Sequence, residues 1–178
     1  MVAYLCDPQI QAKCRANGDD PAALPTTYAS AINAALADKP ADLRVTIHTC
    51  RGNFKSAWVA EGGYDPVVEA MFSTNVDGYF MEFDSARAGN FEPLRALPRG
   101  KKVVLGLVTT KLGDLEDADM LKRRIDEAAK FVPLDDLCLS PQCGFSSTHH
   151  GNALSMDDQW RKLERVVEVA RSVWGGVA

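Results

Sequence analysis

The sequence lacks any long hydrophobic run, and this absence excludes a membrane-spanning helix. No stretch of about 18 consecutive apolar residues occurs in the chain. The first seven residues, MVAYLCD, do not combine a basic segment with a following apolar one, so we expect no signal peptide. These two features predict a protein without membrane contact.

Runs of basic residues are missing as well. The chain has 20 Lys and Arg residues against 24 Asp and Glu residues, which gives a formal net charge of -4. Domains that bind nucleic acid usually carry a clustered basic patch. We therefore expect no nucleic-acid partner.

The cysteines do not form an even, regularly spaced set. There are five of them among 178 residues, an arrangement that fits a reducing compartment better than a disulfide framework. The composition, 46% hydrophobic and 25% charged, is ordinary for a soluble globular protein. Neither a repeat nor a low-complexity linker interrupts the chain. We expect one cytoplasmic α/β domain over residues 1–178.

Strand and helix patterns alternate along the chain. Apolar, β-branched runs predict strands at 43–50, 78–83, 103–110 and 137–140. Helical spacing predicts helices at 8–16, 27–38, 67–72, 91–97, 117–132 and 155–174. Such alternation predicts a parallel sheet with right-handed crossovers. Four strand–helix units are half of a TIM-type (β/α)8 barrel, which typically needs about 250 residues.

Some local features sharpen these expectations. Asp65 followed by Pro66 is typical of a helix start, and Ser155 to Asp158 has the pattern of a capping box. The strand at 103–110 is almost wholly apolar, as expected for a strand covered on both faces. In the last helix we expect the buried side to carry Trp160, Leu163, Val167, Ala170 and Trp174.

Potential metal ligands stand at three places where an apolar run gives way to polar residues and glycine. His48 and Cys50 end the first predicted strand, Glu82 ends the second, and Cys143 follows the fourth. In parallel sheets these strand ends meet at one edge. An imidazole, two thiols and a carboxylate form a ligand set that suits zinc. The pattern therefore points to a zinc site, although each residue also has a simpler explanation.

Those simpler explanations remain open at this point. His48 and Cys50 could be core residues, and Glu82 could form a salt bridge with Arg51 or Arg87. We interpret Cys6, Cys14 and Cys138 as core residues, and His149 and His150 as solvated loop residues. Three polar residues flank the candidate ligands and could orient them, or could equally serve surface or capping roles: Arg51, Asn53 and Asp84.

Four segments of the sequence resemble the catalytic half of cobalamin-independent methionine synthase. The likeness extends from about residue 4 to residue 174, and it includes short bacterial homologues that also look like epoxyalkane:coenzyme M transferases. The segments are HTCRGNF (48–54), AEGGY (60–64), FMEFD (80–84) and LSPQCGF (139–145).

The resemblance implies a fold, a cofactor and a reaction. In that family a (β/α)8 barrel holds a catalytic Zn²⁺ through a histidine, a cysteine two residues later, a glutamate and a distant cysteine. The matching positions are His48, Cys50, Glu82 and Cys143. The resemblance implies no further catalytic residues, and it implies that a zinc-activated thiolate attacks a methyl donor. The partners would be a small thiol such as homocysteine and a folate-type or other methyl donor.

The same resemblance leaves two alternatives open and raises one further expectation. The chain could transfer another alkyl group to a thiol, as epoxyalkane:coenzyme M transferases do, or it could be a truncated zinc-binding domain that is inactive alone. The N-terminal half of the family's barrel is absent from this sequence. A half-barrel would leave two apolar strand edges unpaired, so we expect a homo-oligomer or a partner that completes the barrel.

Overall fold

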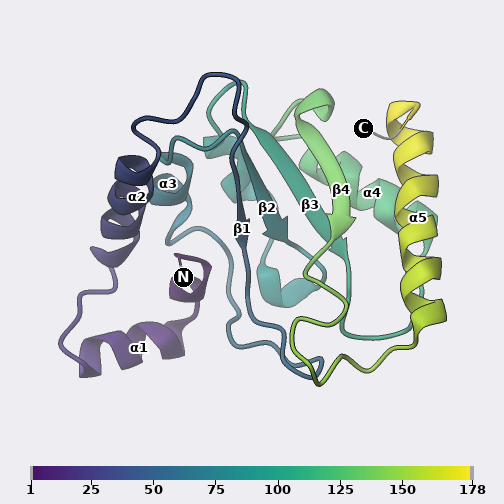
Figure 1. Cartoon of the computed structure of the whole chain (residues 1–178), viewed down its shortest axis with the longest axis horizontal. Helices are drawn as coiled ribbons and strands as arrows, with labels where there is room; N and C mark the ends of the chain where they lie inside the picture. The colour runs from purple at the N-terminus through teal and green to yellow at the C-terminus, as the bar shows by residue number, and fades with distance from the viewer. Residues whose placement is uncertain (1, 177–178) are drawn as a thin grey trace.

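A computed structural model describes residues 2–176, and a four-stranded parallel sheet lies at its centre (Figure 1). The strands are β1 (Thr46–Thr49), β2 (Gly78–Glu82), β3 (Lys102–Val108) and β4 (Leu137–Pro141), and they lie in sequence order. The fold is thus α/β and corresponds to half of a (β/α)8 barrel, as the alternating pattern predicted, and the family resemblance implied that it is the C-terminal half. Each strand begins or ends within a few residues of its predicted position.

Helices lie beside both edges of the sheet (Figure 1). Near β1 lie α1 (Pro8–Ala16), α2 (Leu24–Ala35) and α3 (Val68–Phe72), and near β4 lie α4 (Ala118–Ala128) and α5 (Met156–Trp174). Four short 3-10 helices complete the described elements: η1 (Val2–Cys6), η2 (Ala86–Ala88), η3 (Glu92–Ala96) and η4 (Leu134–Asp136). The helix expected at 91–97 is therefore a 3-10 turn.

Two helix starts follow the sequence signals and a third does not. Ser155 and Asp158 form the predicted capping box of α5, and Asp117 caps α4 by accepting from the backbone N–H of Met120. The predicted start at Asp65 is wrong. Helix α3 begins at Val68 without a side-chain cap. The chain first makes a turn in which the carbonyl of Tyr64 accepts from the backbone N–H groups of Val67 and Val68.

The core lies between one face of the sheet and the helices. Alternate residues of β2 and β3 point into it, and Tyr79, Met81, Val103 and Leu105 are at most 1% exposed. Leu121 and Ile125 of α4 cover them from outside. Packing on this face fixes the positions of the strand ends relative to one another.

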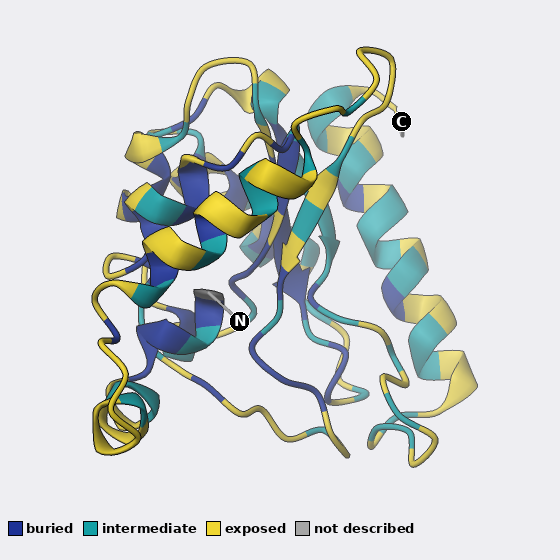
Figure 2. Cartoon of the chain, turned by 60° about the vertical axis from the view of Figure 1, so that its left-hand side comes forward, coloured by how far each residue is buried: buried dark blue, intermediate teal, exposed yellow. Residues whose placement is uncertain are grey.

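The opposite face of the sheet is more open. His48, Phe80 and Lys102 are exposed on it, and Val104 and Ser140 are half-buried. The expectation that β3 is covered on both faces holds for most of the strand, because among its seven residues only Lys102 is exposed and Val104 is half-buried. Figure 2 shows buried residues, in dark blue, gathered in the middle of the molecule and exposed residues, in yellow, on its outer surfaces.

The buried side of α5 also differs from the prediction. Lys162 and Val169 are fully buried, whereas Trp160 is 55% exposed. Lys162 can lie inside because its ammonium group contacts both carboxylate oxygens of Glu116, at 2.9 and 3.0 Å. The sequence pattern does not reveal that ion pair, so it assigns Lys162 to the exposed face. The predicted buried face of α5 is therefore displaced around the helix axis.

Candidate metal centre

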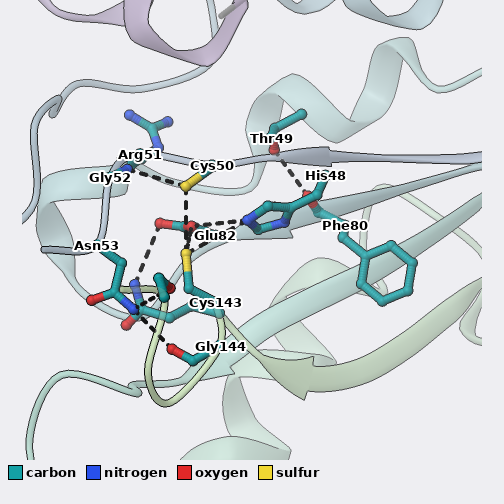
Figure 3. A network of polar contacts seen from close by, with 12 residues as sticks. His48, Thr49, Cys50, Arg51, Gly52, Asn53, Phe80, Glu82, Cys143 and Gly144 are labelled. Atoms are coloured by element: carbon teal, nitrogen blue, oxygen red, sulfur yellow. Dashed lines mark hydrogen bonds and ion pairs between the residues drawn. The ribbon is translucent and has the colours of Figure 1, made fainter. Parts of the chain in front are cut away.

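Four potential ligand atoms meet at the C-terminal ends of the strands. One atom each from His48, Cys50, Glu82 and Cys143 lies within 4.8 Å of all the others. His48 Nε2 is 3.4 Å from Glu82 Oε1 and 3.6 Å from Cys143 Sγ, and the two sulfurs are 3.5 Å apart. Figure 3 shows these four side chains pointing toward one another.

The spacing fits a small tetrahedral ion. Ligands about 2.0–2.3 Å from zinc lie roughly 3.3–3.8 Å from one another at the corners of a tetrahedron. Three of the measured separations fall in that range. The fourth, 2.7 Å between Cys143 Sγ and Glu82 Oε1, is shorter because the thiol donates a hydrogen bond to the carboxylate. The donor set and its dimensions therefore suit Zn²⁺.

The end of β1 presents its two ligands through a sharp change of direction. His48 lies in the strand, and Cys50 lies just beyond its last residue, Thr49. The backbone N–H of Gly52 donates to Cys50 Sγ at 3.3 Å. Gly52 has φ +97°, and a side chain there would strike Val59, so only glycine lets the loop fold back this closely.

The ends of β2 and β3 make room for the carboxylate and for the Cys143 loop. Glu82 is paired in register with Gly106 on β3 and is fully buried. A Cβ atom on Gly106 would lie 3.0 Å from both the Cα of Gln142 and the carbonyl oxygen of Met81. The absence of a side chain at position 106 thus lets the loop after β4 approach Glu82.

The Cys143 loop is held against the β1 loop by a side-chain amide. Asn53 Nδ2 donates to the carbonyl of Gly144 and to Ser147 Oγ, each at 2.8 Å. These bonds join segments that lie more than 90 residues apart in the sequence. They keep Cys143 beside Cys50.

The electrostatics of the cluster favour one thiolate, at Cys50, which accepts hydrogen bonds from its neighbours. Hydrogen bonds from Cys143 and His48 lower the pKa of Cys50 to about 4, whereas the Cys50 thiolate, burial and Glu82 raise the pKa of Cys143. Hydrogen bonds to Cys50 and Glu82 raise the pKa of His48 to about 9. Burial opposes ionisation of Glu82, but hydrogen bonds from His48 and Cys143 outweigh it and lower its pKa to about 2. Near neutral pH the cluster therefore holds imidazolium, thiolate, thiol and carboxylate.

One arginine compensates the acidic groups. Arg87 Nη2 lies 3.5 Å from Glu82 Oε2 and 2.7 Å from Asp84 Oδ1. The Gln142 amide completes this group when its oxygen accepts from Arg87 at 3.0 Å and its nitrogen donates to Asp84 Oδ2 at 2.7 Å. The proposed salt bridge between Glu82 and Arg87 thus exists alongside the ligand cluster, not instead of it.

The other predicted residues separate into those near the cluster and those away from it. Asn53 and Asp84 contact the groups that surround the ligands. The Arg51 guanidinium points away from the ligands in Figure 3 and lies over the Tyr64 ring, 4.2 Å from its centre. His149 and His150 are exposed in the loop after Cys143, while Cys6 is buried and Cys14 and Cys138 are half-buried elsewhere.

Sequence reasoning missed several residues that shape the site. Tyr64, Gln142 and Lys111 are buried, and Lys111 Nζ donates to the carbonyl of Gly52 at 3.0 Å. Tyr64 and Gln142 lie in segments that carry the family resemblance, yet nothing in their spacing reveals where their side chains point. A buried lysine in a loop gives no signal in a hydrophobic pattern.

The chain is similar to two proteins of Bacillus subtilis. The uncharacterized proteins YxjH and YxjG of Bacillus subtilis (strain 168) are 54% and 55% identical to the chain over 162 and 159 residues. These matches cover 90% and 88% of this chain but only 43% and 42% of the relatives. The chain therefore spans less than half the length of the curated relatives it matches.

Solved structures show the same fold. The crystal structure of a putative vitamin-B12 independent methionine synthase from Listeria monocytogenes superposes with a TM-score of 0.72 at 38% identity, over 97% of this chain and 46% of that one. A B12-independent methionine synthase from Shewanella sp. W3-18-1, in complex with selenomethionine, gives 0.65 at 22% identity over 82% and 42% of the two chains. The latter likeness concerns the fold alone.

Residues 17–172 match the family described as the cobalamin-independent synthase catalytic domain. This match confirms the resemblance seen in the sequence, and the chain belongs to that family.

Proposed function

We propose that this chain is the zinc-binding catalytic part of a thiol methyltransferase similar to cobalamin-independent methionine synthase. The convergence of His48, Cys50, Glu82 and Cys143 within 4.8 Å carries the proposal. Zinc held by these four residues would supply thiol activation, because a thiol with an ordinary pKa near 8.5 would lose its proton on binding the ion. We propose homocysteine or a similar small thiol as the acceptor and a folate-type or other methyl donor.

The residues of the chain contribute charge and position. Two thiolates and one carboxylate around a divalent ion leave a formal charge of about -1, which favours a nucleophilic substrate sulfur. Arg87 holds Glu82 and Asp84 in place. The His48 side chain is 39% exposed on the open face of the sheet, whereas Glu82 is fully buried. A substrate thiol would therefore enter from the His48 side.

Metal analysis combined with X-ray absorption tests this function. We expect one zinc per purified chain, and one additional sulfur neighbour when homocysteine is added. A Cys138→Ala variant should behave as the wild type, because Cys138 lies in the same strand region but outside the cluster. A purified chain that holds no metal after reconstitution with zinc would contradict the proposal.

Transfer of a different alkyl group is the alternative within the same chemistry. The ligand cluster activates a thiol and does not itself select the electrophile. Incubating the zinc-loaded protein with thiols and either methyl donors or epoxides distinguishes the two, because only the matching electrophile yields a thioether product.

A second candidate function is suggested by the open face of the sheet. His48 and Phe80 are exposed there, and the chain spans less than half of its curated relatives. In this alternative the chain binds zinc but is inactive until another chain, or a second copy, completes the barrel. Full turnover by the purified chain alone would exclude it. Light scattering that shows a well-folded monomer at low and high concentration would exclude the completing partner.

We also propose a cytoplasmic location. The site requires two free thiols whose sulfurs are 3.5 Å apart, and a reducing compartment keeps such a pair from forming a disulfide. No helix in residues 2–176 is long and apolar enough to cross a membrane.

A further inference from the structure

The hydroxyl group of Tyr64 lies between the ends of two strands that carry metal ligands. Tyr64 is fully buried, and it belongs to the loop after β1, fourteen residues beyond Cys50. Its oxygen is 3.0 Å from the backbone nitrogen of Glu82 and 3.2 Å from Thr49 Oγ1. Thr49 directly precedes Cys50, and Glu82 is itself one of the four candidate ligands.

The hydrogen bonds at this point form a consistent chain. Thr49 Oγ1 donates to the carbonyl of Phe80 at 3.0 Å, so its oxygen is available to accept. Tyr64 can therefore donate to Thr49, or to the carbonyl of Glu82 at 3.3 Å, while it accepts from the N–H of Glu82. Burial raises the pKa of Tyr64, so the hydroxyl keeps the proton that this arrangement requires.

The end of β1 explains why the tyrosine is needed. The ladder between β1 and β2 stops at the pair Thr49 and Met81, because Cys50 turns away from the strand. The next amide on β2 that faces β1 belongs to Glu82, and it donates to the Tyr64 hydroxyl at 3.0 Å. A buried amide needs an acceptor, and the Tyr64 hydroxyl supplies one just where the ladder ends.

We infer that Tyr64 is a positioning residue that fixes the backbone of Glu82 relative to the ends of β1, and thereby sets the spacing of the metal ligands. The Arg51 guanidinium, over the Tyr64 ring and 3.5 Å from its hydroxyl through Nε, holds the ring in place. This inference rests on the proposed function, because it assigns Tyr64 a role toward the same metal site.

Tyr79 offers a matched control within the same sheet. It is also fully buried, and its hydroxyl lies 3.0 Å from Thr74 Oγ1 and 3.2 Å from Lys101 Nζ. It lies near the opposite end of β2 from the ligands. Tyr79→Phe and Tyr64→Phe thus remove the same atom from equally buried environments, but only the second removal touches the ligand end.

The experiment compares Co²⁺ and Zn²⁺ affinity in the two variants by competition with a chromophoric chelator. We expect Tyr64→Phe to weaken binding about 10- to 100-fold and to change the visible absorption of the Co²⁺ form. Tyr79→Phe should lower the urea midpoint of the metal-free protein and leave affinity and spectrum unchanged. Equal affinities in the two variants would overturn the inference.

A second pair of variants keeps the test decisive if Tyr64→Phe does not fold. Thr49→Val removes the other end of the hydrogen-bond chain, and Thr49→Ser retains its hydroxyl. We expect Thr49→Val to weaken metal binding and Thr49→Ser to restore it, whereas wild-type affinity in Thr49→Val would contradict the inference. Failure of the wild-type protein to bind either ion would instead overturn the proposed function and, with it, this role.

Discussion

The two ends of the parallel sheet use charged residues in different ways. At the N-terminal end Asp77 is paired with Lys39 at 2.9 Å and Arg44 at 3.2 Å, and Lys102 is paired with Asp136 at 2.7 Å. At the C-terminal end Glu82 and Asp84 share one arginine, Arg87. The other members of the ligand cluster there are two thiols and an imidazole, which can serve as metal ligands.

The difference teaches where this half-barrel separates stability from chemistry. Acids matched by cations on other segments fasten loops together, whereas an excess of soft and anionic donors remains free to bind a cation. The same division is known for complete (β/α)8 barrels, whose active sites lie at the C-terminal ends of the strands. Variants at the C-terminal end should therefore change metal affinity, whereas variants at the N-terminal end should change stability alone.

The largest effect is expected from removing a ligand at the C-terminal end. Cys143→Ala should weaken zinc binding by at least about 100-fold, the upper end of what changes around a ligand cause. Removing zinc with a chelator should likewise abolish thiol alkylation by the wild type. Zinc content after dialysis against a chelator measures the first effect, with Cys138→Ala as the control. Retention of zinc by Cys143→Ala would remove the distinction between the two ends.

The dependence of metal affinity on pH sharpens the comparison further. In the metal-free protein His48 has its pKa raised to about 9, and Cys143 also keeps its proton at neutral pH. Both protons must leave when an ion binds, so affinity should rise between pH 6 and 9 by up to about 100-fold per pH unit. Calorimetry in buffers of different ionisation enthalpy counts the released protons. A value near zero would show that these groups are not ligands.

A smaller effect, on stability alone, is expected at the N-terminal end. Asp77 accepts from the backbone N–H of Val45 and pairs with Lys39, and these contacts lower its pKa. A lowered folded-state pKa stabilises the protein above the unfolded value of about 3.9 and loses that effect as pH falls through the folded pKa. Asp77→Asn should lower the urea midpoint at pH 7 and leave zinc affinity unchanged. The gap to the wild type should shrink below about pH 4.

The smallest effect is expected from the two histidines beside the site. His149 and His150 are exposed in the loop after Cys143, and His150 contacts the edge of Phe54. The double variant with alanine at both positions should bind zinc as tightly as the wild type. A marked loss of zinc would show that the C-terminal end contains ligands beyond the four.

The sequence predicts much of this architecture because its signals are local. Alternating strand and helix patterns placed all four strands, and the pattern Ser155 to Asp158 located the start of α5. The candidate ligands could be proposed because parallel strand ends share one edge of a sheet. Their assignment as ligands remains a prediction, although the structure brings their atoms together.

Features that depend on distant partners could not be predicted. Lys162 is buried only because Glu116, 46 residues earlier, accepts its charge. Tyr64 closes a gap between two strand ends, and no periodic pattern encodes such a contact. The turn at Tyr64 likewise replaces the helix start that Asp65 and Pro66 suggested.

The Cys50 and Cys143 sulfurs come from the loops that follow the two outermost strands of the sheet, β1 and β4. In a flat sheet those strands would lie roughly 14 Å apart, at about 4.8 Å per interval, yet the sulfurs are 3.5 Å apart. A bound ion would thus connect the two edges of the curved sheet and preserve its curvature. Removal of the ion by a chelator would let the edge strands β1 and β4 move apart. Amide exchange would then become faster in β1 and β4 before it does in β2 and β3.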